Sequence, residues 1–80
     1  MIKDGEIISV AVVFGQPYRI KPLKFRWSGR TIEVKDITYF WKTREGTSDI
    51  YHFSVSCDSS MYELSFNASS LIWRLEAVEG

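Results

Sequence analysis

One short segment of this chain holds residues that could do nucleophilic chemistry. His52, Ser54 and Ser56 alternate along it, Cys57 follows, and Glu63 comes shortly after. A base beside a hydroxyl or thiol, oriented by an acid, is the arrangement that such catalysis requires. Residues two apart on a strand share a face but lie about 7 Å apart at the Cα, which is far for a direct contact between nucleophile and base. We therefore expect a polar row on a sheet face, and we expect that the protein is not an enzyme.

The supply of metal-binding and redox residues is small. The chain has one histidine, His52, and one cysteine, Cys57. A single thiol cannot form an intramolecular disulfide, and this pair offers no ligand spacing for zinc. We expect Cys57 to face the core as a small hydrophobic residue. The expectation is therefore no metal and no cofactor, with the reducing cytoplasm as the location.

No membrane segment is expected. The longest apolar stretch, 7–14, is far shorter than the ~20 residues that a membrane helix requires. It is preceded by Asp4 and Glu6 and not by basic residues, so it does not have the pattern of a secretory signal.

The charges of the chain are sorted by position. Residues 1–44 carry nine cations and four anions, a net charge of +5, whereas residues 45–80 carry one cation and six anions, a net charge of −5. The zero net charge of the whole chain therefore conceals a dipolar molecule. Such asymmetry favours a basic surface for an anionic partner, or two surfaces that attract each other.

The basic segment 19–44 supplies the candidate binding residues. Its cations are interleaved with aromatic residues, as in small barrels that stack bases on aromatics and contact phosphates with cations. Alternating cations also keep an exposed sheet face in solution, and alternation sends Phe25 and Trp27 into the core, which leaves Tyr18 and Phe40 to stack. The candidate binding residues are Lys24, Arg26, Arg30, Lys35, Phe40, Lys42 and Arg44.

Protein interaction is the competing hypothesis, and it is the one we prefer. Segment 7–14 is apolar at both parities, so it should be central or covered by an interface, and Phe40 is expected to point outward. A chain of 80 residues also has a thin margin of stability. Burial against a second copy or another protein accommodates all three features, and a homodimer is the commonest form. The expected function is a non-catalytic binding module with a protein partner or a second copy, with nucleic acid as the alternative.

Alternation of apolar and polar residues predicts an all-β domain over residues 1–80. About six strands, joined mostly by tight turns, should form a small antiparallel meander curled into a closed or half-open barrel of SH3-like size. The tail 71–77 fits a strand or a helix, and we prefer the strand. Ser28-Gly29 should form a two-residue turn, and 43–49 a polar loop.

The same alternation assigns side chains to the core. Leu23, Phe25 and Trp27 should point inward, with Lys24 and Arg26 outward. The parity then changes across residues 35–36, which indicates a bulge or sharp bend. Beyond that point Ile37, Tyr39 and Trp41 share one face and Phe40 has the other.

Three short motifs carry a resemblance to a known family. They are Phe25-Arg26-Trp27-Ser28-Gly29-Arg30, Tyr62-Glu63-Leu64 and Trp73-Arg74-Leu75. Together they make the chain similar to a family of short uncharacterised bacterial proteins with the pattern F-x-W-x-G-R, Y-E-L and W-x-L, over roughly residues 22–78. The resemblance implies a compact all-β domain of bacterial origin and no particular activity.

Overall fold

The chain folds into seven β-strands. The computed structural model describes the backbone of residues 2–16 and 20–79 and the side chains of 5–16 and 20–79. Within those ranges no helix is long and apolar enough to cross a membrane. The prediction of an all-β fold is confirmed, and the tail is a strand. The strands are β1 (Ile2–Phe14), β2 (Ile20–Trp27), β3 (Arg30–Glu33), β4 (Asp36–Glu45), β5 (Ser48–Cys57), β6 (Ser60–Asn67) and β7 (Ile72–Glu79).

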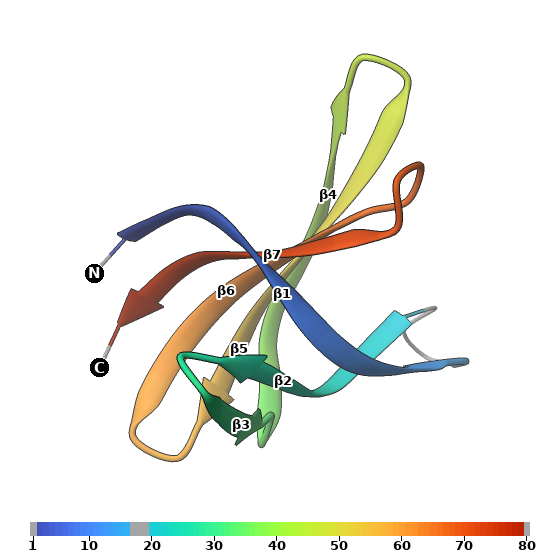
Figure 1. Cartoon of the computed structure of the whole chain (residues 1–80). Helices are drawn as coiled ribbons and strands as arrows, with labels where there is room; N and C mark the ends of the chain where they lie inside the picture. The colour runs from blue at the N-terminus through green and yellow to red at the C-terminus, as the bar shows by residue number, and fades with distance from the viewer. Residues whose placement is uncertain (1, 17–19, 80) are drawn as a thin grey trace.

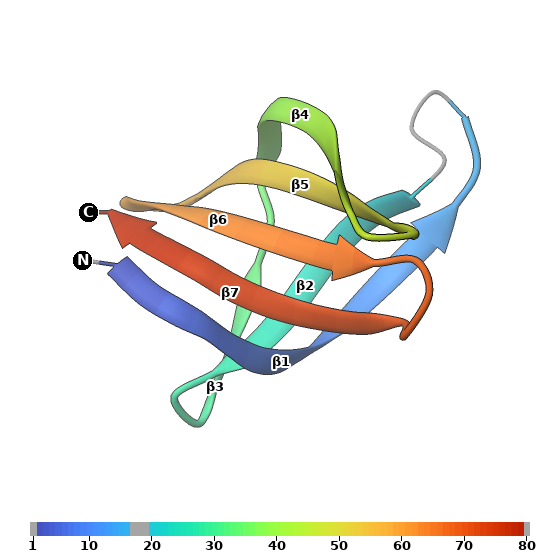
Figure 2. The same ribbon diagram turned by 90° about the horizontal axis from the view of Figure 1, so that it is seen from above.

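All seven strands belong to one curled sheet in the order β3-β2-β1-β7-β6-β5-β4, and every neighbouring pair is antiparallel (Figures 1 and 2). β3 and β4 follow each other in the chain, yet they are the two edges of the sheet. The Val34 N–H donates to the carbonyl of Leu23 in β2 at 2.9 Å, and the Lys35 N–H donates to the carbonyl of Ser56 in β5 at 2.8 Å. A two-residue bend therefore carries the chain from one edge to the other, which explains why the sheet curls and why it has seven strands and not about six.

Two hairpin turns follow from residues that accept a left-handed backbone. Ser28 and Gly29 have φ values of 55° and 75°, the signature of a type I′ turn, as predicted. Gly46 has a φ of 63° at the first central position of the turn between paired Glu45 and Ser48, which fits a type II′ turn. The prediction of a loop over 43–49 is wrong, because this glycine lets both strands continue almost to the tip. In Figure 1 the far end of the β4–β5 hairpin extends beyond the other strands.

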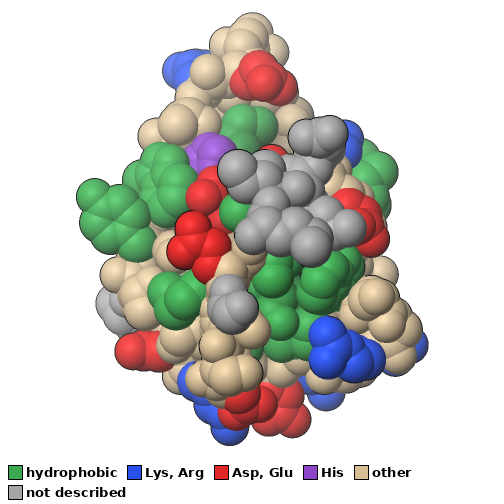
Figure 3. Space-filling view, turned by 90° about the vertical axis from the view of Figure 1, so that its left-hand side faces the viewer, with side chains coloured by type: hydrophobic (Ala, Val, Ile, Leu, Met, Phe, Trp, Pro, Cys, Tyr) green, Lys and Arg blue, Asp and Glu red, His purple; other side chains and the backbone are tan. Residues whose placement is uncertain are grey.

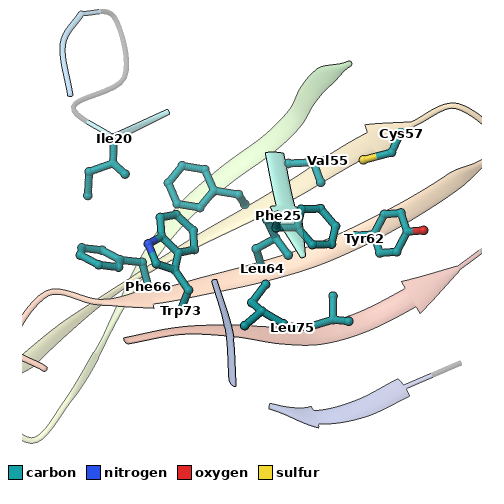
Figure 4. Packing of buried hydrophobic residues seen from close by; sticks show 11 residues of the cluster. Ile20, Phe25, Val55, Cys57, Tyr62, Leu64, Phe66, Trp73 and Leu75 are labelled. Atoms are coloured by element: carbon teal, nitrogen blue, oxygen red, sulfur yellow. The ribbon is translucent and has the colours of Figure 1, made fainter. Parts of the chain in front are cut away.

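The core lies on the concave side of the sheet (Figure 4). Phe53, Val55, Leu64 and Leu75 have no exposed surface, and each such side chain stabilises the fold by about 1.5–3 kcal/mol. Cys57 also faces the core, as predicted, and burial is the main reason that the pKa of its thiol is raised above 9.0. Alternation predicts one inward face, formed by Tyr51, Phe53, Val55 and Cys57 of β5 and by Tyr62, Leu64 and Phe66 of β6, and the structure confirms it.

A β-bulge corrects the prediction for β2. Ala11 of β1 pairs with Lys24, but the next residue, Val12, pairs with Pro22, so Leu23 has no partner on β1. The extra residue resets the alternation, because a bulge inserts one residue into one strand of a pair. Leu23 is consequently 41% exposed, and its predicted inward position is wrong.

A second irregularity, at Thr38, corrects the prediction for β4. Ile37 pairs with Val55 and Tyr39 pairs with Ser54, which leaves Thr38 without a partner on β5. The odd spacing near residues 35–36 was correctly interpreted as a bend, but this bulge lies just beyond it and reverses the parity a second time.

The Phe40 side chain therefore lies on the core-facing side of β4 and not on its outer side. Its ring packs on Phe53, with 5.1 Å between centroids, and it pairs with Phe53 in register. Tyr39 and Trp41 lie on the outer face instead. The sequence prediction for all three aromatic residues is wrong, because strict period-two alternation holds only where a strand has no bulge.

β1 lies inside the sheet, between β2 and β7. This is one of the two predictions for its apolar segment, the other being that an interface covers it. Ile8 is buried in the core, whereas Ile7 and Val13 on the outer face are 61% and 47% exposed. The apolar outer face of β1 is thus open to solvent in the single chain.

Candidate functional site

β4 forms the longer of the two open edges of the sheet. Over residues 2–16 and 20–79 no strand pairs with β4 on the side away from β5. β4 is ten residues long, and three consecutive aromatic residues, Tyr39, Phe40 and Trp41, lie at its middle. Proteins usually blunt long edges, because unpaired N–H and C=O groups pair readily with other strands.

The outer side of this edge carries a row of rings. The Tyr39 and Trp41 centroids are 5.4 Å apart, with an angle of 49° between the rings. The Trp41 and His52 rings are stacked, with 4.9 Å between centroids and 4° between planes. His52 covers one face of the Trp41 ring, and the other face looks across the open edge. Tyr39 is 67% exposed. The aromatic row therefore ends, at the open edge, in a ring that lies mostly in solvent.

The backbone direction along β4 follows from the hairpin register. Glu45 and Ser48 close a two-residue turn, and such a turn places a hydrogen-bonded pair at its base. Hydrogen-bonded and non-hydrogen-bonded pairs alternate in an antiparallel ladder. Thr43 and Trp41 therefore direct their N–H and C=O groups toward β5, whereas Arg44 and Lys42 direct theirs toward the open edge.

A polar cluster covers the outer face beside the aromatic row. Figure 3 shows the histidine of the chain, in purple, with acidic side chains next to it. The His52 Nε2 lies 2.8 Å from the Thr43 Oγ1, and its Nδ1 is shielded from solvent without a hydrogen-bond partner. A proton on Nε2 that is donated to Thr43 leaves only a lone pair at Nδ1, which costs less than a stranded N–H. His52 is therefore held as a rigid support for the Trp41 ring.

The remainder of the cluster ties β1, β6 and β7 together. The buried Ser65 hydroxyl donates to the Glu76 Oε2 at 2.7 Å, and the Arg74 Nη1 donates to the Gly5 carbonyl at 2.8 Å. Gly5 has a φ of 68°, and a Cβ there would lie 3.2 Å from the Arg74 Cδ. Ser65, Arg74 and Glu76 line a cleft of about 250 Å³ together with His52. The bonds hold the carboxylate and the guanidinium still, so the cluster stabilises the sheet at two register shifts.

The residues considered for nucleophilic chemistry do not converge. His52, Ser54 and Ser56 share the outer face of β5, as predicted, but the hydrogen bond of His52 goes to Thr43. Cys57 faces the core on the other side of the sheet. Among residues 5–16 and 20–79, no three His, Cys, Asp or Glu side chains are grouped to hold a metal ion.

The predicted binding residues fall into three separate groups. Lys24 and Arg26 share the outer face of β2 and line a depression of about 320 Å³, whose floor includes Ser9 and Ala11. Arg26 is oriented by a 3.4 Å hydrogen bond to the Thr31 hydroxyl. No ion pair involves Lys24 or Arg26 within the described part of the chain.

The second group lies at one end of the half-barrel. Arg30 and Lys35 line an opening of about 350 Å³ between the β2–β3 hairpin and the β5–β6 turn. The Lys35 Nζ is 3.8 Å from the Asp58 Oδ1, and Glu33 is a further lining residue. Carboxylates therefore balance the cations of this opening.

The third group, Phe40, Lys42 and Arg44, lies on the core-facing side of β4, along the projecting hairpin. The Lys42 ammonium is 6.0 Å from the centre of the Tyr51 ring, and the Arg44 Nε is 3.8 Å from the Asp49 Oδ1. The seven candidates thus lie at three places and not on one face. Two further residues of the predicted basic segment, Tyr18 and Arg19, lie outside the described residues.

Comparison with known proteins adds no relative: no family model, no curated protein and no solved structure matches the chain.

Two features of the outer face were not predicted from the sequence. Tyr39 and Trp41 were assigned to the core, and no residue type near Thr38 marks the bulge that turns them outward. The contacts of Ser65, Glu76 and Arg74 were also missed. Gly5 was a usable signal, because a glycine inside a strand pattern indicates a bulge or a close approach.

Proposed function

We propose that this protein is a non-catalytic interaction module that binds an extended polypeptide strand along the open edge of β4. One observation carries the proposal: β4 is a ten-residue edge strand whose side away from β5 has no neighbour in the described chain, and at its centre Tyr39 is exposed and Trp41 is half-buried on the outer face. Strand addition uses backbone hydrogen bonds for affinity and side-chain contacts for specificity.

The chemistry of the edge supports this kind of ligand. The N–H and C=O groups of Lys42 and Arg44 that point to the open edge can form backbone hydrogen bonds with an added strand. The face of the Trp41 ring away from His52 can form an apolar contact with it. His52 stacks on the opposite face of Trp41, so the ring is already ordered before a ligand arrives. Preorganisation lowers the entropy cost of binding.

The test is a selection of displayed peptides on wild-type protein at low concentration, followed by binding to two variants. Lys42→Pro removes one N–H that faces the open edge and no hydrogen bond of the hairpin, which an edge strand tolerates. Lys42→Ala keeps that N–H and is the matched control. Selected peptides should bind Lys42→Pro about tenfold or more weakly than Lys42→Ala. Peptides that bind both variants equally, or a selection that enriches none, would overturn the proposal.

Nucleic-acid binding by residues 19–44 is the second candidate. What supports it is the depression lined by Lys24 and Arg26, since its two cations are not in ion pairs and no carboxylate is among its lining residues. No exposed aromatic side chain lines it, however, and base stacking supplies much of the affinity for single strands. We therefore rank it second.

This second candidate has its own test. Fluorescence anisotropy of a labelled single-stranded oligonucleotide at low salt should rise with protein concentration, and the affinity should fall steeply with added salt. The double variant Lys24→Ala, Arg26→Ala should weaken binding, whereas Lys42→Ala should not. A flat titration at low salt eliminates the candidate.

A further inference from the structure

We infer that the strand which occupies the β4 edge is β4 of a second copy of this chain, paired antiparallel about a two-fold axis at Phe40. This inference rests on the proposed function, because it assigns the occupant of the same edge. The product is a continuous sheet through two protomers with a closed, isologous interface.

The order of the aromatic residues makes this edge complementary to itself. Antiparallel pairing with Phe40 opposite Phe40 of the second copy puts Tyr39 opposite Trp41 of that copy, and Trp41 opposite its Tyr39. Aromatic pairs of this kind are among the more stabilising cross-strand pairs. Tyr39 is 67% exposed in the single chain, so the arrangement covers the most exposed ring of the edge.

The same pairing extends the aromatic row across the interface. His52 covers one face of the Trp41 ring at 4.9 Å. Tyr39 of the second copy would cover the other, on the outer face of the joined sheets. An unrelated extended strand would cover both rings only if it carried one aromatic residue opposite Tyr39 and another opposite Trp41. A second β4 does so by its own sequence.

The charges of β4 do not oppose the arrangement. Lys42 comes beside the uncharged Thr38 of the second copy, two residues beyond the axis. Beyond the bulge of one strand come Lys35 and Asp36, and the end of the other strand that faces them carries Arg44 and Glu45. Each of these segments has one cation and one anion, so no net repulsion arises between them whatever the register past the bulge.

In the described part of the chain, the projecting half of β4 has no neighbouring strand on the side away from β5, whereas Asp36 and Ile37 at its near end line an opening of about 200 Å³ together with Lys21 and Leu23 of β2. The far end of the β4–β5 hairpin extends beyond the other strands (Figure 1). Because the paired strands run in opposite directions, the curled bodies of the two protomers lie toward opposite ends of the interface. The bulge at Thr38 limits the continuous ladder to the residues around Phe40 and Lys42, so the aromatic contacts provide much of the affinity.

The experiment measures mass by sedimentation across a dilution series of the whole chain. Wild-type protein should have twice the 9.3 kDa mass of the chain at high concentration and dissociate on dilution. Lys42→Pro should raise the dissociation constant about tenfold or more relative to Lys42→Ala. Circular dichroism of both variants shows whether the fold is kept.

A cross-linking experiment tests the register. The Cα atoms of Tyr39 and of Trp41 in the second copy would be about 4.5 Å apart, as in any non-hydrogen-bonded antiparallel pair, which a disulfide can span. A mixture of Tyr39→Cys and Trp41→Cys chains should therefore oxidise to a mixed dimer, and neither variant should cross-link alone. Wild-type chain, with only the buried Cys57, is the control.

The outcomes separate the two proposals. A monomer at every concentration, a dimer that Lys42→Pro leaves intact, or cross-links in another combination would each overturn the second copy as occupant. If peptide binding at β4 still depends on the Lys42 N–H in that case, the interaction module stands with a different strand as its ligand. If the dimer forms as described, selected peptides should dissociate it.

Discussion

The two edges of this sheet are neighbours in the chain, yet they differ in almost every respect. β3 has four residues and ends at a bend, and the next residue, Val34, bonds back to β2. β4 has ten residues, and exposed rings lie at its centre. A short edge that folds back offers little backbone to a foreign strand, whereas the longer edge offers unpaired N–H and C=O groups on the hairpin side of the bulge at Thr38.

The two edges also differ in how deeply the side chains beside them are buried. The β3 side rests on the barrel body, where Phe25 is 1% exposed and contacts the Tyr62 ring edge-on at 5.2 Å. On the β4 side, the core-facing ring at the centre of the strand is Phe40, which is 39% exposed. The side chains beside the β3 edge are therefore packed more tightly than the ring at the centre of β4.

The largest effect should come from breaking the support of the β3 side. Phe25→Ala should lower the free energy of unfolding by about 3–5 kcal/mol, because it leaves a cavity in the core. Phe40→Ala, on the β4 side, should cost only about 1–2 kcal/mol, because the ring is already partly in water. Urea unfolding of both variants measures the difference. Equal losses would contradict the contrast between the two edges.

A control on the same strand tests the bulge beside the β3 edge. Leu23→Ala should change the free energy of unfolding by less than about 1 kcal/mol, since the side chain is 41% exposed. A loss as large as that of Phe25→Ala would mean that Leu23 faces the core, as plain alternation predicted.

The hairpin turns next to the two edges allow a closer comparison. Gly29→Ala and Gly46→Ala should each cost about 1–2 kcal/mol, because their φ values of 75° and 63° are unfavourable for L-residues. Gly15→Ala is the matched control, since its φ is not left-handed and a Cβ there meets no atom within 4 Å. Thermal melting measures all three. A neutral Gly46→Ala would argue against the two-residue turn that sets the backbone direction of β4.

A smaller effect is expected on the outer face between the two edges. Ser65→Ala should lower the free energy of unfolding by about 1–2 kcal/mol, because the buried hydroxyl donates to the Glu76 carboxylate. Ser54→Ala, on the half-buried outer row of β5, should cost less. If the two variants are equally stable in urea, the Ser65–Glu76 bond contributes nothing to the sheet.

The smallest effect is a pH trend at the bend that joins the edges. Burial raises the pKa of Cys57 above 9.0, Asp58 adds to this, and the Lys35 backbone hydrogen bond opposes it. Above pH 9.0 the unfolded chain therefore loses this proton before the folded chain does, so stability should fall as the pH rises. Wild type should lose stability relative to Cys57→Ala across that range in urea titrations. Parallel curves would mean that the thiol is accessible to water.

The bulges explain why the sequence predicted the body better than the edges. β5 and β6 keep strict alternation from Tyr51 to Phe66, so the inward side chains could be assigned from the sequence. Leu23 and Thr38 are ordinary residues that mark no bulge. The bulge in β2 turns Leu23 itself outward, and the one at Thr38 moves every later side chain of β4 to the opposite face. The positions of Phe40, Lys42 and Arg44 were predicted by counting across Thr38.

By itself, the sequence determined the all-β class, the Ser28-Gly29 turn and the buried side of β5 and β6. These depend on local alternation and on backbone preferences of single residues. Only the tertiary structure decided that β3 and β4 are the two edges, that Tyr39 and Trp41 lie on the outer face, and that the cations of residues 24–44 lie at three places. Those outcomes depend on register between strands distant in the chain, where one inserted residue moves every later side chain to the opposite face of the sheet.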